Sequence, residues 1–158
     1  RCCYENSRDN ARTPMQWTDD ENAGFTDGTP WLAMNPNYRQ INVREQEART
    51  DSVLVYYRRL VHLRKADAYR ETFTYGIFEP AYQEMADVFA YYRVSGESGQ
   101  RILVAANFGT DAVSLPLAYS CRQVLLSNLR AESAVETACE KANALTLESC
   151  EVAVIELG

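Results

Sequence analysis

Residues 7–17 read SRDNARTPMQW and place two arginines, one acid, an amide pair and one tryptophan in a short stretch. The planar guanidinium of arginine donates in a fixed fork that suits carboxylates and vicinal hydroxyls. The tryptophan ring offers a flat apolar face on which a sugar can lie. The stretch therefore predicts contact with a polar, ring-shaped ligand. The alternative for these residue types is a structural loop with Arg/Asp ion pairs and a packed Trp17.

Short motifs follow this stretch in a fixed order. They are NAGFT at 22–26, PW at 30–31, NPNY at 35–38, INV at 41–43, Gln46, SV at 52–53 and YYRRL at 56–60. Together with 7–17, they resemble the distal part of an alpha-glucosidase of the alpha-amylase superfamily, in the branch of oligo-1,6-glucosidases, maltases, isomaltases and sucrose isomerases. The resemblance is dense over residues 7–65 and looser, though still in order, from there on; it is weakest over 120–149.

The resemblance implies a fold of two parts, α/β followed by all-β. Residues 1–68 are expected to be the distal end of a (β/α)8 catalytic barrel, with an active-site loop and the last barrel helix. Residues 69–158 are expected to be a small antiparallel β-sandwich domain. Because a (β/α)8 barrel alone needs about 250 residues, we expect this chain to be a fragment of an enzyme that continues upstream.

The residue pattern changes along the chain in a way that fits two parts. Residues 1–40 are rich in Pro, Gly, Asn and Asp without periodicity, which is typical of a functional loop. From residue 51 to 65 apolar side chains recur at helical spacing, with Asp51 or Ser52 as the N-cap. This segment is predicted to be an amphipathic helix.

Beyond residue 70 the period falls to two and turn residues recur, which predicts antiparallel strands. The strands expected are 72–78, 88–94, 102–108, 113–117, 124–126, 145–147 and 152–157. Residues 128–143 interrupt this pattern with Ala, Glu and Lys, and we expect a surface loop with a short helical turn there.

The charge balance excludes some partners. There are 16 Lys and Arg residues against 22 Asp and Glu residues, a formal net charge of −6. This is not the footprint of a nucleic-acid-binding protein. No apolar run approaches the roughly 18 residues of a membrane helix. We expect neither nucleic acid nor a membrane as a partner.

Five cysteines, at 2, 3, 121, 139 and 150, show no CxxC spacing, and His62 is the only histidine. Zinc ligation and a catalytic role for His62 are therefore disfavoured, and we predict no metal and no cofactor. We expect free thiols in a reducing compartment, which favours a cytoplasmic protein. The alternative is a disulfide between two of Cys121, Cys139 and Cys150.

The chain is not expected to carry the catalytic groups of a glycosidase. Retaining glycosidases use a carboxylate nucleophile and a carboxylic acid about 5 Å apart. The acids of the first segment are Asp9, Asp19, Asp20, Glu21 and Asp27. None matches the catalytic motifs of the family, which the resemblance places upstream, so no catalytic residue is assigned.

Arg8 and Arg12 are the predicted substrate-binding residues. The resemblance implies that Arg8 lines the pocket for the terminal, non-reducing glucose, where it pairs with an upstream aspartate and contacts sugar hydroxyls in the −1 subsite. Arg12 lies in the same motif. Its alternative role is to pin the loop by bonding backbone carbonyls or an acid such as Asp9.

Aromatic side chains of the first segment have two interpretations. Trp17, Trp31 and Phe25 either stack against sugar faces or pack under the loop, and for Phe25 we favour packing. Tyr56 and Tyr57 lie on the apolar stripe of the predicted helix, so a core role is expected for both.

The resemblance implies a parent enzyme that is a retaining, exo-acting alpha-glucosidase for short alpha-1,4 or alpha-1,6 glucosides such as maltose, isomaltose or sucrose. The isolated chain is expected to be inactive, with a small saccharide and the missing N-terminal part of the barrel as partners. One alternative is glucosyl transfer of the sucrose isomerase or trehalose synthase type. Another is a noncatalytic sugar-binding β module. Phe89, Tyr91 and Phe108 argue against it, because all three are compatible with a place in the core.

Overall fold

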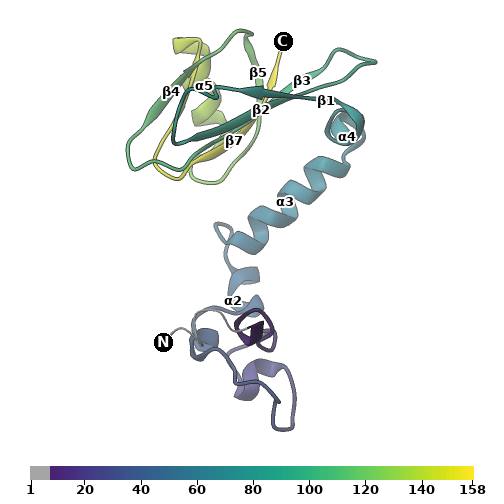
Figure 1. The fold of residues 1–158 in the computed structure, drawn as a ribbon, viewed down its shortest axis with the longest axis vertical. Helices are drawn as coiled ribbons and strands as arrows, with labels where there is room; N and C mark the ends of the chain where they lie inside the picture. The colour runs from purple at the N-terminus through teal and green to yellow at the C-terminus, as the bar shows by residue number, and fades with distance from the viewer. Residues whose placement is uncertain (1–7) are drawn as a thin grey trace. The chain divides into compact units, whose positions relative to one another are not determined.

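The computed structural model describes residues 8–158, which divide between Arg58 and Arg59 into two compact units (Figure 1). The first unit contains η1 (Arg8–Ala11), η2 (Glu21–Gly24), η3 (Pro36–Arg39), α2 (Val43–Ala48) and the start of α3 (Val53–Lys65). The second contains the rest of α3, α4 (Asp67–Tyr75), β1 (Ile77–Ala81), β2 (Val88–Val94), β3 (Arg101–Asn107), β4 (Val113–Pro116), β5 (Cys121–Ser127), α5 (Glu132–Ala142), β6 (Ala144–Leu147) and β7 (Val152–Leu157). The domain boundary expected after residue 68 stays a prediction.

The helix predicted over residues 51–65 is confirmed as α3, and Ser52 is its N-cap. The Ser52 hydroxyl accepts a hydrogen bond from the Val55 N–H at 3.2 Å and donates one to the Gln46 carbonyl at 2.6 Å. The core role expected for Tyr57 is wrong within this chain, because 63% of its surface is exposed. Tyr57 lines an open hollow instead of a packed core.

We expect the substitution Ser52→Ala to lower the free energy of unfolding by about 1 kcal/mol, the usual cost of a lost N-cap. The Val55 N–H and the Gln46 carbonyl both lose a partner that is 4% exposed in the native chain. Urea unfolding followed by far-UV circular dichroism measures the change. Ser114→Ala, at an exposed position of β4, is the control. Equal midpoints for the two variants would contradict the capping role.

Every strand pair of the second unit is antiparallel, as the sequence predicts. A five-stranded sheet has the order β1-β2-β3-β7-β5, and β4 pairs with β6 in a separate two-stranded sheet. β7 lies between β3 and β5, and all of its residues except Val152 are buried. Its hydrophobic run is therefore an interior strand of the sheet, paired on both sides.

The core of the second unit lies between the sheets and α5. Its fully buried side chains include Leu103 and Ile155, which are paired across β3 and β7. Leu115 of β4 and Leu145 of β6 face the same cluster and are 0% exposed. The two-stranded sheet therefore closes one face of the core.

The strand predicted over residues 72–78 is wrong in its first half, because the chain is helical through Tyr75. Tyr69 and Phe73 stand one turn apart on α4 with ring centroids 6.5 Å apart, and Thr72 is 1% exposed. This packing overrides the β propensity of Thr and Phe. At Gly76 a side chain would meet the Thr72 carbonyl oxygen at 2.4 Å, so glycine is required where the helix ends and β1 begins.

The surface loop expected over residues 128–143 is also wrong, because most of it forms the helix α5. Val135 and Cys139 are four residues apart on α5, and each is 1% exposed. Asn143 ends the helix in the left-handed conformation, with φ of 48°. The Ala and Glu content of this segment agrees with helix propensity.

The core role considered for Phe89 and Phe108 is wrong, because they are 57% and 73% exposed. Phe89 alternates with the buried Ala90, so its ring lies on the other face of the sheet. There the ring of Tyr91 is 5.7 Å from that of Phe89 and 5.0 Å from that of Phe78. This face of the sheet therefore carries an aromatic cluster of Phe78, Phe89 and Tyr91.

Candidate functional site

The loop that carries the opening motif is tied to α2 by backbone hydrogen bonds. The Val43 and Arg44 N–H groups donate to the carbonyls of Gln16 and Trp17 at 2.9 and 3.0 Å. The Gln16 side-chain amide donates to Asn37 Oδ1 at 3.0 Å. The end of the motif, at Gln16 and Trp17, is therefore held by backbone and side-chain bonds within the unit.

A tight turn at residues 22–24 folds the loop back on itself. Asn22, Ala23 and Gly24 have φ of 51°, 55° and 64°, the left-handed region. The Asn22 side chain supports this turn by donating to the carbonyls of Thr26 and Gly28 at 3.3 and 3.0 Å. The Ala23 carbonyl then accepts the N–H groups of residues 17 and 18, each at 3.0 Å. The turn thus fixes the backbone of Trp17.

Asn42 joins the end of the loop to α2. It is 5% exposed and caps α2, with Oδ1 accepting from the Glu45 N–H at 2.9 Å. Its amide donates to the Tyr38 carbonyl, also at 2.9 Å. Both halves of this buried side chain are therefore satisfied.

The acids at 19 and 20 form ion pairs and are not a catalytic pair. Arg44 binds Asp19 at 3.0 Å and Asp20 at 2.8 Å. A hydrogen bond from Thr18, followed by the hydrogen bond and charge of Arg44, lowers the pKa of the Asp20 carboxyl. A glycosidase acid needs a raised pKa, so the electrostatics favour a structural role for Asp20.

The predicted substrate-binding residues lie at the start of this scaffold. Arg8 begins η1, and its side chain lies outside the described part of the structure. Arg12 is exposed, and its backbone N–H donates to the Asp9 carbonyl at 2.9 Å. This bond closes the turn at η1. The side chain of Arg12 lies at the surface of the described chain.

The aromatic residues of the loop are more exposed than packing under it requires. Trp31 is 97% exposed, while Trp17 and Phe25 are each 48% exposed. Trp31 therefore does not pack within the described chain, whereas Phe25 is half-buried and the packing favoured for it stays a prediction. Their rings remain available to groups outside it.

Beside the loop, the first unit contains a wide apolar hollow of about 710 Å³. Its apolar lining includes Met15, Ile41, Val53 and Tyr57, which are between 49% and 79% exposed. None of the described residues that line it is a carboxylate. Exposed apolar surface of this kind is typical of regions that contact another domain or molecule.

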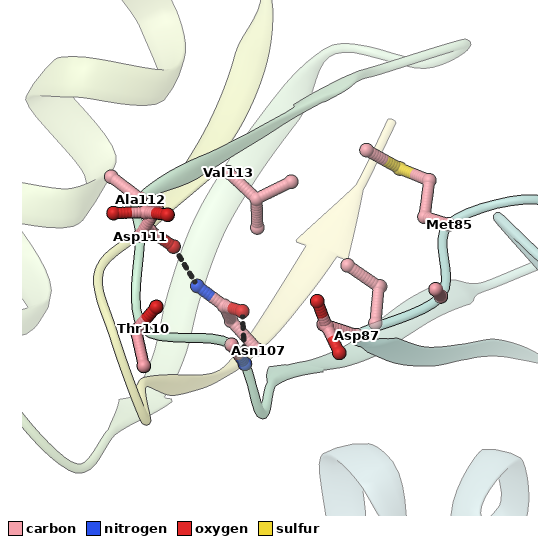
Figure 2. A pocket seen from close by; sticks show the side chains of 10 residues that line it. Met85, Asp87, Asn107, Thr110, Asp111, Ala112 and Val113 are labelled. Atoms are coloured by element: carbon pink, nitrogen blue, oxygen red, sulfur yellow. Dashed lines mark hydrogen bonds between the residues drawn. The ribbon is translucent and has the colours of Figure 1, made fainter.

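The second unit has a smaller hollow of about 310 Å³, between the segment before β2 and the β3–β4 loop (Figure 2). Asn107 is 2% exposed; its amide donates to the Asp111 carbonyl at 2.9 Å, and its Oδ1 accepts from the Gly109 N–H at 2.9 Å. Figure 2 shows the side chains of Asp87 and Asp111 on opposite sides of Asn107. The buried amide holds the loop, and we assign this hollow no catalytic role.

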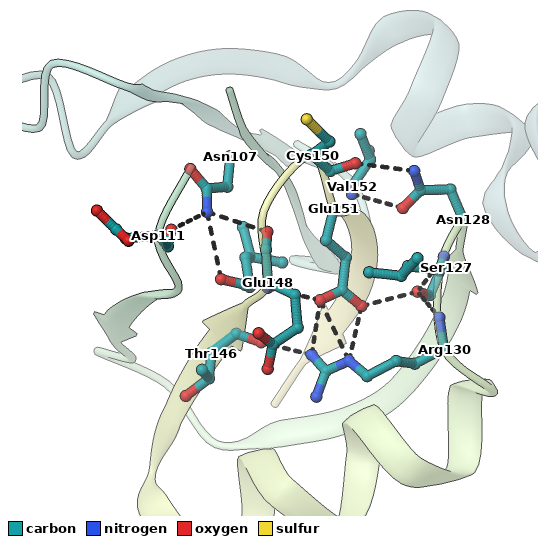
Figure 3. A network of polar contacts seen from close by, with 12 residues as sticks. Asn107, Asp111, Ser127, Asn128, Arg130, Thr146, Glu148, Cys150, Glu151 and Val152 are labelled. Atoms are coloured by element: carbon teal, nitrogen blue, oxygen red, sulfur yellow. Dashed lines mark hydrogen bonds and ion pairs between the residues drawn. The ribbon is translucent and has the colours of Figure 1, made fainter. Parts of the chain in front are cut away.

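A buried ion pair stabilises the turn before β7 (Figure 3). Glu151 is 0% exposed and accepts from Arg130 Nε at 2.9 Å and from Arg130 Nη2 at 2.8 Å. It also accepts from the Ser127 hydroxyl at 3.1 Å and the Glu148 N–H at 2.8 Å. A carboxylate with this many donors is a structural anchor, and the sequence analysis did not identify it.

No metal site or membrane span is found among residues 8–158. They contain no group of three or more His, Cys, Asp or Glu side chains placed to hold a metal ion. None of the described helices is long and apolar enough to cross a membrane.

Comparison with known proteins shows which family the chain resembles. Residues 1–76 match the family model described as the alpha-amylase catalytic domain. The chain belongs to the alpha-amylase superfamily. Within it, the similarity is to the alpha-glucosidase branch. An oligo-1,6-glucosidase of Bacillus cereus is 40% identical over 82% of this chain, and a glucan 1,6-alpha-glucosidase of Streptococcus pneumoniae is 41% identical over 82% of it.

Solved structures of related enzymes share the fold. An isomaltulose synthase of Klebsiella is 34% identical, with a TM-score of 0.80 over 96% of this chain and 26% of its own. A trehalulose synthase of Pseudomonas mesoacidophila is 32% identical, also with a TM-score of 0.80, 96% of this chain and 26% of its own covered. The predicted fold class, the end of a catalytic barrel followed by an antiparallel β domain, is confirmed. The chain spans about a quarter of the length of the curated relatives, 23% for both glucosidases.

The sequence motifs contained supporting residues whose roles were not predicted. Gln16, Asn22 and Asn42 belong to the motifs behind the resemblance, and each donates to a backbone carbonyl of the loop. An asparagine just before a helix is a recognisable N-cap signal, so the role of Asn42 was open to prediction. The long-range partners of Gln16 carried no such local signal.

Proposed function

We propose that this chain is the distal part of a retaining, exo-acting alpha-glucosidase that hydrolyses short alpha-1,4 or alpha-1,6 glucosides. The observation that carries the proposal is the similarity to oligo-1,6-glucosidases at about 40% identity over four-fifths of the chain. That similarity includes both the loop unit and the sheet unit, so a sugar-binding module alone does not account for it. The nucleophile and the acid/base are supplied by the upstream part of the barrel.

Within this enzyme, we propose that Arg8 and Arg12 contribute to substrate binding. Both arginines precede, in the same motif, the hydrogen-bonded segment around Gln16 and Trp17. A fork of donors holds vicinal hydroxyls of the terminal glucose and closes the end of the pocket, which favours removal of one glucose at a time. The bond between the Arg12 N–H and the Asp9 carbonyl orders the turn between the two residues.

The apolar hollow of the first unit fits the partner that this proposal requires. We propose that the upstream part of the same barrel covers Met15, Ile41, Val53 and Tyr57 in the parent enzyme. A barrel helix packs an apolar stripe against its neighbours, and α3 exposes such a stripe here.

Glucosyl transfer is the second candidate, supported by the structural similarity to isomaltulose and trehalulose synthases. These two reactions share a covalent glucosyl intermediate and differ in the acceptor that attacks it. The aromatic cluster of Phe78, Phe89 and Tyr91 gives the noncatalytic sugar-binding module its only support in the described chain.

The deciding experiment recovers the coding sequence upstream of Arg1 and incubates the complete protein with maltose, isomaltose and sucrose. Chromatography of the products separates the candidates. Release of glucose from maltose or isomaltose supports hydrolysis, whereas conversion of sucrose into isomeric disaccharides supports transfer. The isolated chain is the control, and we expect it to release no glucose. Sugar affinity of the isolated chain without activity of the complete protein would favour the binding module.

A further inference from the structure

Two cysteines lie next to each other in the second unit. Cys121 is the first residue of β5, and Cys139 lies on α5, which packs against β5. Cys139 is 1% exposed and belongs to the hydrophobic core, while Cys121 is half-buried and packs against the same cluster. Neither forms a disulfide in the structure.

The surroundings of Cys139 show how close the two thiols are. Burial, followed by the charge of Cys121 and a hydrogen bond to its side chain, raises the pKa of the Cys139 thiol to about 12. Side chains that share a hydrogen bond are neighbours, and this pair joins two elements far apart in sequence. Cys150, by contrast, is exposed in the turn before β7, where its sulfur accepts a hydrogen bond from the Ser149 hydroxyl.

We propose that Cys121 and Cys139 form a reversible dithiol pair that closes into an intramolecular disulfide when the protein meets a small disulfide oxidant of the glutathione type. The bond would link the start of β5 to α5. The chain then exists in a reduced and an oxidised form that differ in one covalent link.

The reaction proceeds by two thiol–disulfide exchanges. The half-buried Cys121 thiolate attacks the oxidant, which forms a mixed disulfide and releases one reduced thiol. The Cys139 thiolate then attacks the sulfur of Cys121, and the second reduced thiol leaves. Two cysteine thiols are oxidised, one small disulfide is reduced, and the two protons pass to the departing thiolates. Because Cys139 is buried with a raised pKa, the second step is the slower one.

The link would restrain α5 in both the folded and the unfolded chain. A disulfide that closes a loop of this size stabilises mainly by restricting the unfolded ensemble. We expect oxidation to raise the midpoint of thermal unfolding by about 5 °C or more. Reduction should restore the lower value.

The experiment treats the full chain with oxidised glutathione in native buffer and, as a matched control, in concentrated urea. After alkylation and trypsin digestion, Cys121 lies in peptide 102–122, Cys139 in 131–141 and Cys150 in 142–158. We expect the native chain to link 102–122 to 131–141 at least about tenfold more often than any other pair. In urea, loop-closure entropy favours the nearer pair, Cys139 and Cys150.

Two variants test the order of the steps. Cys139→Ser should trap the glutathione adduct on Cys121, because the second thiol is missing. Cys121→Ser should leave Cys139 largely unmodified in native buffer, since only 1% of it is exposed. The proposal is overturned if the native chain links Cys150 to either residue as often as Cys121 to Cys139, or if wild type stops at the adduct on Cys121.

Discussion

Replacing Glu151 with glutamine lowers the free energy of unfolding of the second unit by about 3 kcal/mol, the scale of breaking a buried ion pair. The carboxylate is 0% exposed, and its oxygens accept bonds from Arg130, the Ser127 hydroxyl and the Glu148 N–H. A glutamine amide presents a donor where one of these oxygens accepted. At least one buried donor then loses its partner, and the Arg130 guanidinium keeps a charge without a counter-charge.

Urea unfolding followed by far-UV circular dichroism measures this change. The matched control is Glu148→Gln, an exposed carboxylate in the same turn, for which we expect a change within about 0.5 kcal/mol. A double-mutant cycle with Arg130→Met separates the pair energy from the cost of leaving one partner unpaired. If Glu151→Gln and Glu148→Gln unfold at the same urea concentration, the buried pair does not stabilise the fold.

The second large effect is on activity and rests on the proposed function. In the complete enzyme, we expect Arg8→Ala to lower kcat/KM for maltose or isomaltose by about 100-fold. Without the Arg8 guanidinium, the bound substrate reaches the reactive geometry less often. Arg8→Lys should recover part of this loss, since lysine keeps the charge but lacks the planar fork. Initial rates of glucose release provide the measurement.

Two other arginines calibrate this result. Arg39, stacked on the Tyr38 ring at 5.3 Å from its centroid, is the control, and Arg39→Ala should leave kcat/KM within a few-fold of wild type. Arg12→Ala distinguishes its two roles: a rise in KM at unchanged stability indicates substrate binding, whereas a lower unfolding midpoint indicates a pinned loop. Wild-type kcat/KM in Arg8→Ala would show that Arg8 does not contact the reacting sugar.

The strands were predictable from sequence wherever alternation was strong. β2 and β7 begin and end at the predicted residues, because apolar and polar positions alternate or run continuously between clear turns. Ser52 was predicted as a possible cap because serine before an apolar-periodic segment has a local mechanism. These features depend on neighbours in the chain.

The errors arose where distant contacts decide the structure. The aromatic and Thr residues of α4 favour a strand locally, but Thr72 is buried as part of a helix and its hydroxyl bonds Gln100. The helix α5 was missed because its Val135 and Cys139 face a core assembled from other strands. Glu151 gave no signal at all, since a single acid becomes a structural anchor only when Arg130 reaches it across the fold.

The candidate site was predictable as a motif but not as a complete site. The arginines and amides of residues 7–46 are visible in the sequence, and the resemblance they carry agrees with the relatives. The core role considered for Phe89 was wrong because the burial of a strand residue depends on which face of the sheet it lies on. Catalytic carboxylates were assigned to the upstream barrel, and that assignment stays a prediction.

The place of β7 between β3 and β5 has a consequence for synthesis on the ribosome. β1, β2 and β3 emerge first and pair as a meander, but the free edge of β3 has no partner until β7 follows. β5 also has no pairing partner until β7 is made, since β7 is its only neighbour in the five-stranded sheet. The nascent chain therefore carries open strand edges for most of the time that this unit is being made, and these edges are the surfaces that chaperones would need to shield.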